Sequence, residues 1–216
     1  GRLGAGCSPP GPSGQPRPWS EWAGGDLFTR HRPPSHRVCG WGGRGSTLFF
    51  LKKGCRGTTV ESDATWVQQL QERIRELGAD AESRWDLRFV PVVDNSDPAI
   101  ADYVQQVESG APWDVVMVDG WSRLKCLLAG LHEVGPGGIL VLDNANQKQF
   151  VDVPGIMRSW KRHAFRGLGV ARSWVTQTDV YIRSADSDQR SAAGQQGSRE
   201  GTGDAVVGEG CRPPAR

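Results

Sequence analysis

Several features that would assign this chain to a large functional class are missing from its sequence. The 216 residues include 26 basic and 24 acidic side chains, a net charge of +2, and no basic run long enough to follow a phosphate backbone. No apolar stretch approaches the roughly 18–20 residues that a membrane-spanning helix needs. No charged segment followed by an apolar one marks a secretory signal at the start. We therefore expect neither a nucleic-acid partner nor a membrane partner.

Cysteine is scarce and dispersed. The five cysteines are odd in number, widely spaced and without a CxxC pair, so neither a zinc site nor a disulfide framework is predicted. Cys39, Cys55 and Cys126 lie in or beside apolar segments and are expected to be small buried hydrophobic side chains. This pattern favours a cytoplasmic location and leaves the oligomeric state open. Because the sequence begins with Gly rather than Met, a preceding part with a targeting signal stays an open alternative.

Both ends of the chain lack apolar residues. Residues 1–18 are more than half Gly and Pro, and the chain from Ser184 onward is rich in Ser, Gly, Gln, Asp and Arg. Such segments cannot bury enough apolar surface to offset their chain entropy. We expect a largely disordered N-terminal segment over 1–36, one globular domain over 37–183 and a disordered tail over 184–216.

Between these ends, short apolar strands alternate with amphipathic helices. The predicted strands are Val38–Trp41, Gly57–Glu61, Leu87–Val93, Val115–Val118 and Ile139–Leu142. Helices are predicted after each strand: Ser46–Lys53, a helix capped by Asp63 with Trp66, Leu70, Ile74 and Leu77 inward, one from Ser96, one along Leu124–Val134, and Ile156–His163. Two last runs, Val170–Val175 and Asp179–Arg183, lie too close for a helix between them and predict an antiparallel hairpin. The fold class is therefore α/β, a three-layer α/β/α sandwich with a Rossmann-like, mostly parallel sheet.

The segment from Asp114 to Asn144 is the most informative part of the chain. One buried strand ends at Asp119, a helix follows, and a second buried strand ends at Asp143. Two strands joined by one helix are parallel, and open parallel sheets bind ligands outside the carboxyl ends of their strands. The sequence therefore predicts a small-molecule site at this edge.

The order of the motifs resembles the class I S-adenosylmethionine (SAM)-dependent methyltransferases. VCGWGGRGSTLFF (38–50) is similar to a VFEWGSGxSTLFF motif, and VESDATW (60–66) to a VEHDxxW motif. Later VDG-x-x-R, GPGG-hhh-LDN and SWVTQTDVY segments look similar too. The resemblance covers about Val38 to Arg183. It implies a seven-stranded sheet whose last strand is antiparallel, SAM as the cofactor, and methyl transfer to an acceptor that the sequence does not identify, by default a small molecule.

The resemblance also implies roles for individual residues. The methionine part of the cofactor is assigned to the turn and helix start formed by Gly42, Gly43, Gly45, Ser46 and Thr47. Glu61 would accept hydrogen bonds from the ribose hydroxyls, and Asp94 or Asn95 would lie near the adenine. Asp119 would face both methyl donor and acceptor, and is the candidate catalytic residue. Each has a structural alternative: the glycines could only make a tight turn, and Asp119 and Asp143 could only cap helices.

Two departures from the family pattern lie in the cofactor turn. Gly40 stands where the family has an acid, and Arg44 where it has the second Gly. One lost charged hydrogen bond costs about 1.5–3 kcal/mol, so a methyltransferase-fold protein without catalysis is an alternative. The same turn reads GxGxxG, with Glu61 at the spacing of a dinucleotide fingerprint, so an NAD-binding oxidoreductase is a further alternative.

A metal hypothesis rests on three residues. Asp119, Asp143 and Asn144 resemble the magnesium ligands of the catechol O-methyltransferases, and such oxygen ligands suit Mg²⁺. The lysine that accompanies the first acid in that family is Ser122 here, and we predict no metal. Arg123 and Lys125 are interpreted as a solvated helix face.

Overall fold

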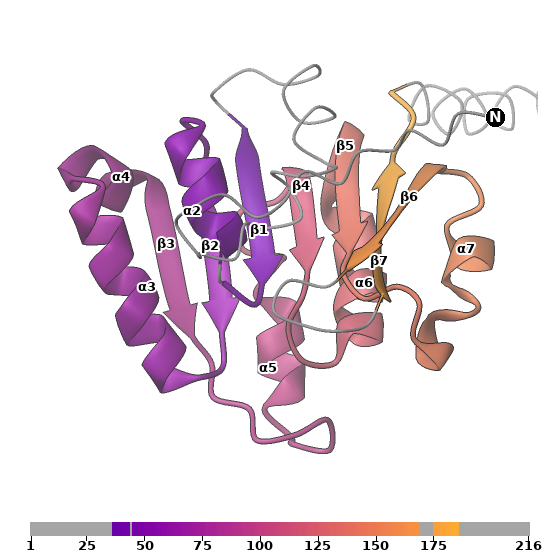
Figure 1. The fold of residues 1–216 in the computed structure, drawn as a ribbon, viewed down its shortest axis with the longest axis horizontal. Coiled ribbons are helices and arrows are strands. Elements are labelled where there is room, and N and C mark those ends of the chain that lie inside the picture. Colours follow the sequence, from indigo (N-terminus) through magenta and orange to yellow (C-terminus); the bar gives the residue numbers. More distant parts are fainter. Residues whose placement is uncertain (1–35, 44, 169–174, 186–216) are drawn as a thin grey trace, which may run out of the picture.

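The computed structural model describes residues 36–43, 45–168 and 175–185. The segments predicted to be disordered therefore lie almost wholly outside the described residues. Seven strands form one sheet in the order β3-β2-β1-β4-β5-β7-β6 (Figure 1). They are β1 (Arg37–Trp41), β2 (Arg56–Glu61), β3 (Trp85–Phe89), β4 (Trp113–Val118), β5 (Val134–Leu142), β6 (Lys161–Leu168) and β7 (Val175–Ile182).

Strand direction confirms the predicted fold class. β1 to β5 pair in parallel, whereas β7 runs antiparallel to both of its neighbours, β5 and β6. Within the sheet, the chain passes from β1 outward to β2 and β3, and then returns to add β4 and β5 on the other side of β1. Strand order thus reverses between β1 and β4, which is where open α/β sheets bind ligands.

Helices cover both faces of the sheet and make the predicted three layers. One face carries α2 (Gly45–Lys52), α3 (Ala64–Glu76) and α4 (Ala79–Arg84), whose buried side chains share a cluster with Val38, Met117 and Val141. The other carries α5 (Ile100–Gln105), α6 (Arg123–Glu133), the short 3-10 turn η2 (Lys148–Phe150) and α7 (Val153–Ile156). Alternate residues of the same strands supply the two clusters, because successive side chains of a strand point to opposite faces.

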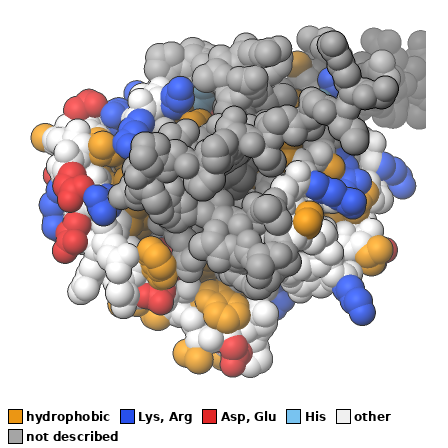
Figure 2. All heavy atoms as spheres, in the orientation of Figure 1, with side chains coloured by type: hydrophobic (Ala, Val, Ile, Leu, Met, Phe, Trp, Pro, Cys, Tyr) orange, Lys and Arg blue, Asp and Glu red, His pale blue; other side chains and the backbone are white. Residues whose placement is uncertain are grey.

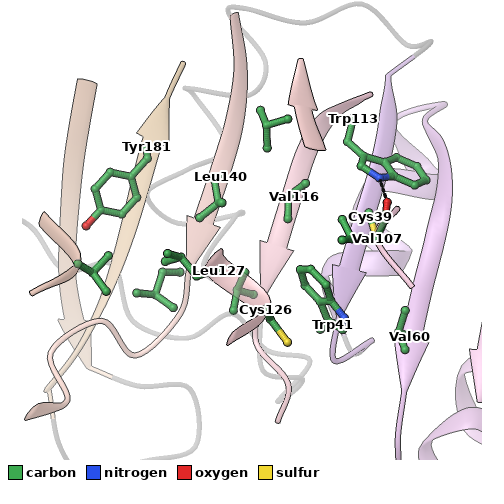
Figure 3. Packing of buried hydrophobic residues seen from close by; sticks show 14 of the residues in the cluster. Cys39, Trp41, Val60, Val107, Trp113, Val116, Cys126, Leu127, Leu140 and Tyr181 are labelled. Carbon is green, nitrogen blue, oxygen red and sulfur yellow. Dashed lines mark hydrogen bonds between the residues drawn. The ribbon is translucent and has the colours of Figure 1, made fainter. Parts of the chain in front are cut away.

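The α5–α6 face of the sheet buries two tryptophan side chains, Trp41 and Trp113. In Figure 3, Trp41, Val116 and Leu140 from three neighbouring strands lie beside Cys126 and Leu127 of α6. Both indoles on this face satisfy their N–H groups: Trp41 Nε1 donates to Tyr103 O at 2.8 Å, and Trp113 Nε1 donates to Val107 O at 2.6 Å. These bonds tie α5 and its following turn to the sheet, because a buried indole N–H needs a partner.

Local signals predicted the start of α3 correctly. Asp63 caps it by accepting hydrogen bonds from Thr65 N at 2.8 Å and Trp66 N at 3.1 Å. Leu70 and Ile74 are buried as expected. Leu77 is 38% exposed, so its assignment to the inner face was wrong; the helix ends before it. Cys39, Cys55 and Cys126 are buried thiols, which confirms that prediction.

The end of the domain differs from the prediction. Ile156–His163 is not a helix: α7 ends at Ile156, and β6 begins at Lys161. An antiparallel hairpin closes the sheet as expected, but β6 and β7 form it. The described parts of the two predicted runs do not pair with each other, because Val175 and residues 179–182 both belong to β7; residues 169–174 lie outside the described part. β3 begins and ends earlier than the predicted Leu87–Val93, and α4 was not predicted. None of the described helices is long and apolar enough to span a membrane.

Candidate functional site

The carboxyl ends of β2, β1, β4 and β5 bring the candidate residues together. Ladder hydrogen bonds continue just past the strands: Gly42 N donates to Val60 O at 2.9 Å, and Asp119 N to Trp41 O at 3.0 Å. Asp143 N donates to Val118 O at 3.0 Å. Glu61, Gly42, Asp119 and Asp143 therefore follow one another along this edge, which lies at the lower side of the sheet in Figure 1.

The glycine turn after β1 is packed tightly onto its surroundings. Gly42 has a φ of +84°, and a Cβ there would lie 2.8 Å from the backbone oxygen of Asp119. A Cβ on Gly43 would overlap with the side chain of Thr59. Glycine is thus required at both positions by internal packing alone. The alternative that these two glycines only make a tight turn therefore has a direct geometric basis, independent of any ligand.

Glu61 is a buried carboxylate that holds this turn. Glu61 lies at the end of β2 and is 6% exposed. Oε2 accepts from Gly43 N at 3.0 Å, while Oε1 accepts from Ser62 N at 2.8 Å and Asp63 N at 3.2 Å. A carboxylate offers about four acceptor positions, so capacity remains on Oε2 for a further donor. Glu61 thus both positions the glycine turn and presents an acid beside it.

The start of α2 offers fewer free hydroxyl groups to a ligand than the sequence suggested. The Thr47 hydroxyl is 2.7 Å from the Thr59 hydroxyl, which also accepts from Trp85 Nε1 at 2.9 Å. Thr47 is 2% exposed, so its hydroxyl serves the contact between α2 and β2. Gly45 and Ser46 are half-buried in the first helical turn. The backbone N–H groups of this turn have no partner within the helix, and they are the donors suited to a carboxylate.

The loop after β3 separates the two adenine candidates. Asp94 is exposed and accepts from Ser96 N at 2.7 Å and Ser96 Oγ at 2.6 Å. The Ser96 hydroxyl, with its backbone N–H, lowers the pKa of the Asp94 carboxyl. Asn95 Oδ1 instead accepts from Ser122 N at 3.0 Å, across to the turn after β4. Asn95 is therefore the residue tied to the Asp119 turn.

Arg123 lies between the two strand-end acids. Its Nη2 is 2.9 Å from Asp119 Oδ1, and its Nη1 is 3.6 Å from Asp143 Oδ2. The guanidinium also donates to the Asp143 backbone oxygen at 2.7 Å and to Gly120 O at 3.2 Å. Its side chain is 18% exposed, so the interpretation of Arg123 as a solvated helix face was wrong. The first turn of α6 returns over the strand ends and carries Arg123 inward.

Tyr103 lies beneath this edge and was not singled out from the sequence. The residue is fully buried, and its hydroxyl has no hydrogen-bond partner among the described residues. A Cβ on Gly120 would overlap with that hydroxyl, so the Asp119–Gly120 turn rests directly on it. Burial raises the pKa of the Tyr103 phenol. In the sequence Tyr103 shows only helical spacing, which indicates a core position and no more.

No group of three or more His, Cys, Asp or Glu side chains suited to a metal occurs within the described ranges. Asp119 and Asp143 are held by Arg123 instead, and Asp143 Oδ1 also accepts from Thr178 Oγ1 at 2.9 Å. The donor set proposed for magnesium therefore already contains a cation. These residues do not fit a bound divalent metal.

A hollow of about 470 Å³ lies at the opposite edge of the sheet, where the strands begin. Four arginines and one acid are among its lining residues. Most of these arginines are bound by the fold itself: Arg37 to Gly110 O and over the Trp113 ring, Arg84 to Asp80 and Cys55 O, and Arg88 to Asp86 and Gln106. We assign them to structure, and the strand-end acids remain the candidate site.

Comparison with known proteins supports the fold assignment. No protein-family model matches the sequence, and a search of curated proteins finds no match. Among solved structures, an O-methyltransferase from Bacillus cereus in complex with SAH has a TM-score of 0.56 at 15% identity, over 69% of this chain and 74% of that one. TomG from Streptomyces achromogenes, an O-methyltransferase of tomaymycin synthesis in complex with SAM, has a TM-score of 0.55 at 13% identity, over 70% and 74%.

A methyltransferase-like protein from Silicibacter pomeroyi covers more of the chain. It matches with a TM-score of 0.53 at 19% identity, over 83% of this chain and 95% of that one. Together with the strand order and the antiparallel β7, these similarities show that the chain has the class I methyltransferase fold.

Proposed function

We propose that this chain binds SAM at the carboxyl edge of β2, β1 and β4 and transfers its methyl group to a small-molecule acceptor. The observation that carries the proposal is the buried carboxylate of Glu61, bonded to Gly43 N at 3.0 Å beside the turn after β1. A buried acid of this kind presents an acceptor to a ligand hydroxyl, one strand away from the point where strand order reverses between β1 and β4.

The charge and apolar surface of this edge support a cationic, aromatic ligand. Among the described residues at this edge, Glu61, Asp119 and Asp143 supply three carboxylates, and Arg123 supplies a guanidinium between the last two. Exposed apolar side chains lie at the ends of β3 and β4: Phe89 is 48% exposed, Val93 81% and Trp121 39%. Figure 2 shows hydrophobic side chains on the surface along this lower edge. A negative field attracts a sulfonium, and flat apolar surface suits an adenine ring.

Asp119 is the residue placed to act on the acceptor. When bound, SAM supplies an electrophilic methyl group: a lone pair of the acceptor forms the new bond to carbon as the C–S bond breaks, and SAH leaves. Arg123 fixes the Asp119 carboxylate at 2.9 Å, next to the glycine turn. From this position Asp119 would orient the acceptor and receive the proton that a neutral acceptor loses.

A methyltransferase-fold protein without catalysis is the second candidate. The observation that favours it is Gly40, which leaves β1 without the family's acid. A Cβ there would be 3.4 Å from the Met117 Cβ, in ordinary contact, so the missing acid is not forced by lack of space at Cβ. Such a protein would bind SAM weakly or not at all, and would show no turnover.

Calorimetry on the full chain tests the proposal. We expect binding of SAM or SAH, and at least about tenfold weaker binding by Glu61→Ala, because a charged acceptor is lost. NAD serves as the control ligand. Binding of NAD without SAM would favour the oxidoreductase alternative, and binding of neither would favour the non-catalytic one. Equal SAM affinity in wild type and Glu61→Ala would remove Glu61 from the site.

A further inference from the structure

We propose that Arg123 is a built-in cation that takes the place of a divalent metal at this edge, so that the site works without metal. The proposal concerns the geometry of Asp119, Asp143 and Arg123. Only its consequence for the acceptor rests on the proposed methyl transfer.

Three oxygen-bearing side chains follow two adjacent strands. β4 and β5 are adjacent and parallel, with Val118 paired to Leu142, so Asp119 and Asp143 emerge side by side. Asn144 follows with a φ of +53°, a left-handed conformation that Asn adopts more readily than most residues. Two carboxylates and an amide are oxygen donors of the kind that Mg²⁺ and Mn²⁺ accept.

The guanidinium of Arg123 fills the space between these acids. It reaches one carboxylate at 2.9 Å and the other at 3.6 Å, and it donates to backbone oxygens on both strand ends. A Mg²⁺ ion needs oxygens at about 2.0–2.1 Å in a near-octahedral shell. Such an ion would have to displace the guanidinium or lie beside it, where the like charges repel.

Neighbouring elements hold Arg123 in this position. Ser122, at the start of α6, has a φ of 45°, and its N–H is bonded to Asn95 Oδ1 at 3.0 Å. Asp143 is oriented from the other side by Thr178 Oγ1 of β7 at 2.9 Å. The ion-pair cluster is thus part of the packing of the loops after β3, β4 and β5, and of β7.

The replacement has a consequence for charge and substrate. One guanidinium leaves these two carboxylates with a net negative charge, whereas a divalent ion would neutralise them. The negative charge favours a cationic methyl donor. A vicinal diol that must chelate a metal is then not the acceptor. A single hydroxyl, thiol or amine, whose proton can pass to Asp119, is the acceptor class that this site suits.

Thermal unfolding of the full chain with Mn²⁺ or with a chelator provides the test. Wild type should have the same melting temperature with Mn²⁺ and with the chelator. The melting temperature of Arg123→Ala should rise by a few degrees when Mn²⁺ is added, and this variant should bind Mn²⁺ at least about tenfold more tightly than wild type. Adding Asp143→Asn to Arg123→Ala should abolish the response. The matched control is Arg162→Ala, which removes an arginine 2.8 Å from the buried Asp179 but leaves no pair of strand-end acids.

Several results would overturn the proposal: wild type stabilised by Mn²⁺ as strongly as Arg123→Ala, a folded Arg123→Ala with no response, or an equal response in Arg162→Ala. If Arg123→Ala does not fold, Arg123→Gln removes the charge while keeping more of the side-chain volume. Direct Mn²⁺ titration of wild type still tests the proposal, because tight binding by wild type would overturn it. SAM binding is measured separately in chelator. Failure of SAM binding with a Mn²⁺ response confined to the Arg123 variants would end the proposed function and leave this inference standing.

Discussion

Replacing Glu61 by Gln tests whether one carboxylate holds the candidate cofactor turn. In the folded chain this carboxylate accepts from the backbone N–H groups of Gly43, Ser62 and Asp63, at 3.0, 2.8 and 3.2 Å. Gln keeps the volume but has one carbonyl oxygen. That oxygen can serve Ser62 and Asp63, while the amide NH₂ then faces Gly43 N, another donor.

The cost of this change follows from the bonds lost. One charged hydrogen bond disappears and two become neutral, and a charged hydrogen bond contributes about 1.5–3 kcal/mol. We therefore expect Glu61→Gln to lower the free energy of unfolding by about 2–4 kcal/mol. For a domain of this size, each kcal/mol corresponds to about 2–4 °C in melting temperature.

Urea unfolding followed by circular dichroism measures the effect, with Glu82→Gln as the control. The Glu82 side chain is 56% exposed, and its ion pair with Arg75 is long at 3.9 Å. The free energy of unfolding of Glu82→Gln should therefore stay within about 0.5 kcal/mol of that of wild type. A Glu61→Gln variant as stable as Glu82→Gln would refute the view that this carboxylate holds the turn. If that variant still lost SAM binding, Glu61 would act only through direct contact with the ligand.

Two further predictions concern buried groups near the site. Gly120→Ala should lower the free energy of unfolding by about 2 kcal/mol or more in the wild type, because the Tyr103 hydroxyl occupies the place of the new Cβ. The same change should cost less in the Tyr103→Phe variant, which lacks that hydroxyl. Equal costs in a double-mutant cycle of unfolding would show that the turn does not rest on this hydroxyl. Cys39 and Cys126 should resist iodoacetamide at mildly alkaline pH until the chain unfolds, because burial raises the pKa of both thiols, that of Cys39 to about 12, and keeps them protonated and inaccessible. Peptide mass spectrometry of native and unfolded protein would contradict this if both thiols reacted equally fast in the two states.

The strands and the edge at which they end were determined by the sequence itself. Apolar runs that stop at Glu61, Asp119 and Asp143, separated by amphipathic helices, require parallel strands, and parallel strands end at a common edge. The cap at Asp63 was equally visible, since its hydrogen bonds connect residues that are close in sequence. Local chemistry was sufficient in each of these cases.

Only the tertiary structure decided β6 and the role of Arg123. The run from Lys161 carries little apolar periodicity; it is a strand because β7 pairs with it along its whole length. Arg123 resembles any charged residue on a helix until the first turn of α6 is placed over the ends of β4 and β5. Each depends on a partner outside its own element: β7 (Val175–Ile182) for β6, and Asp143 at the end of β5 for Arg123. Contacts between elements leave no pattern within the sequence of either element alone.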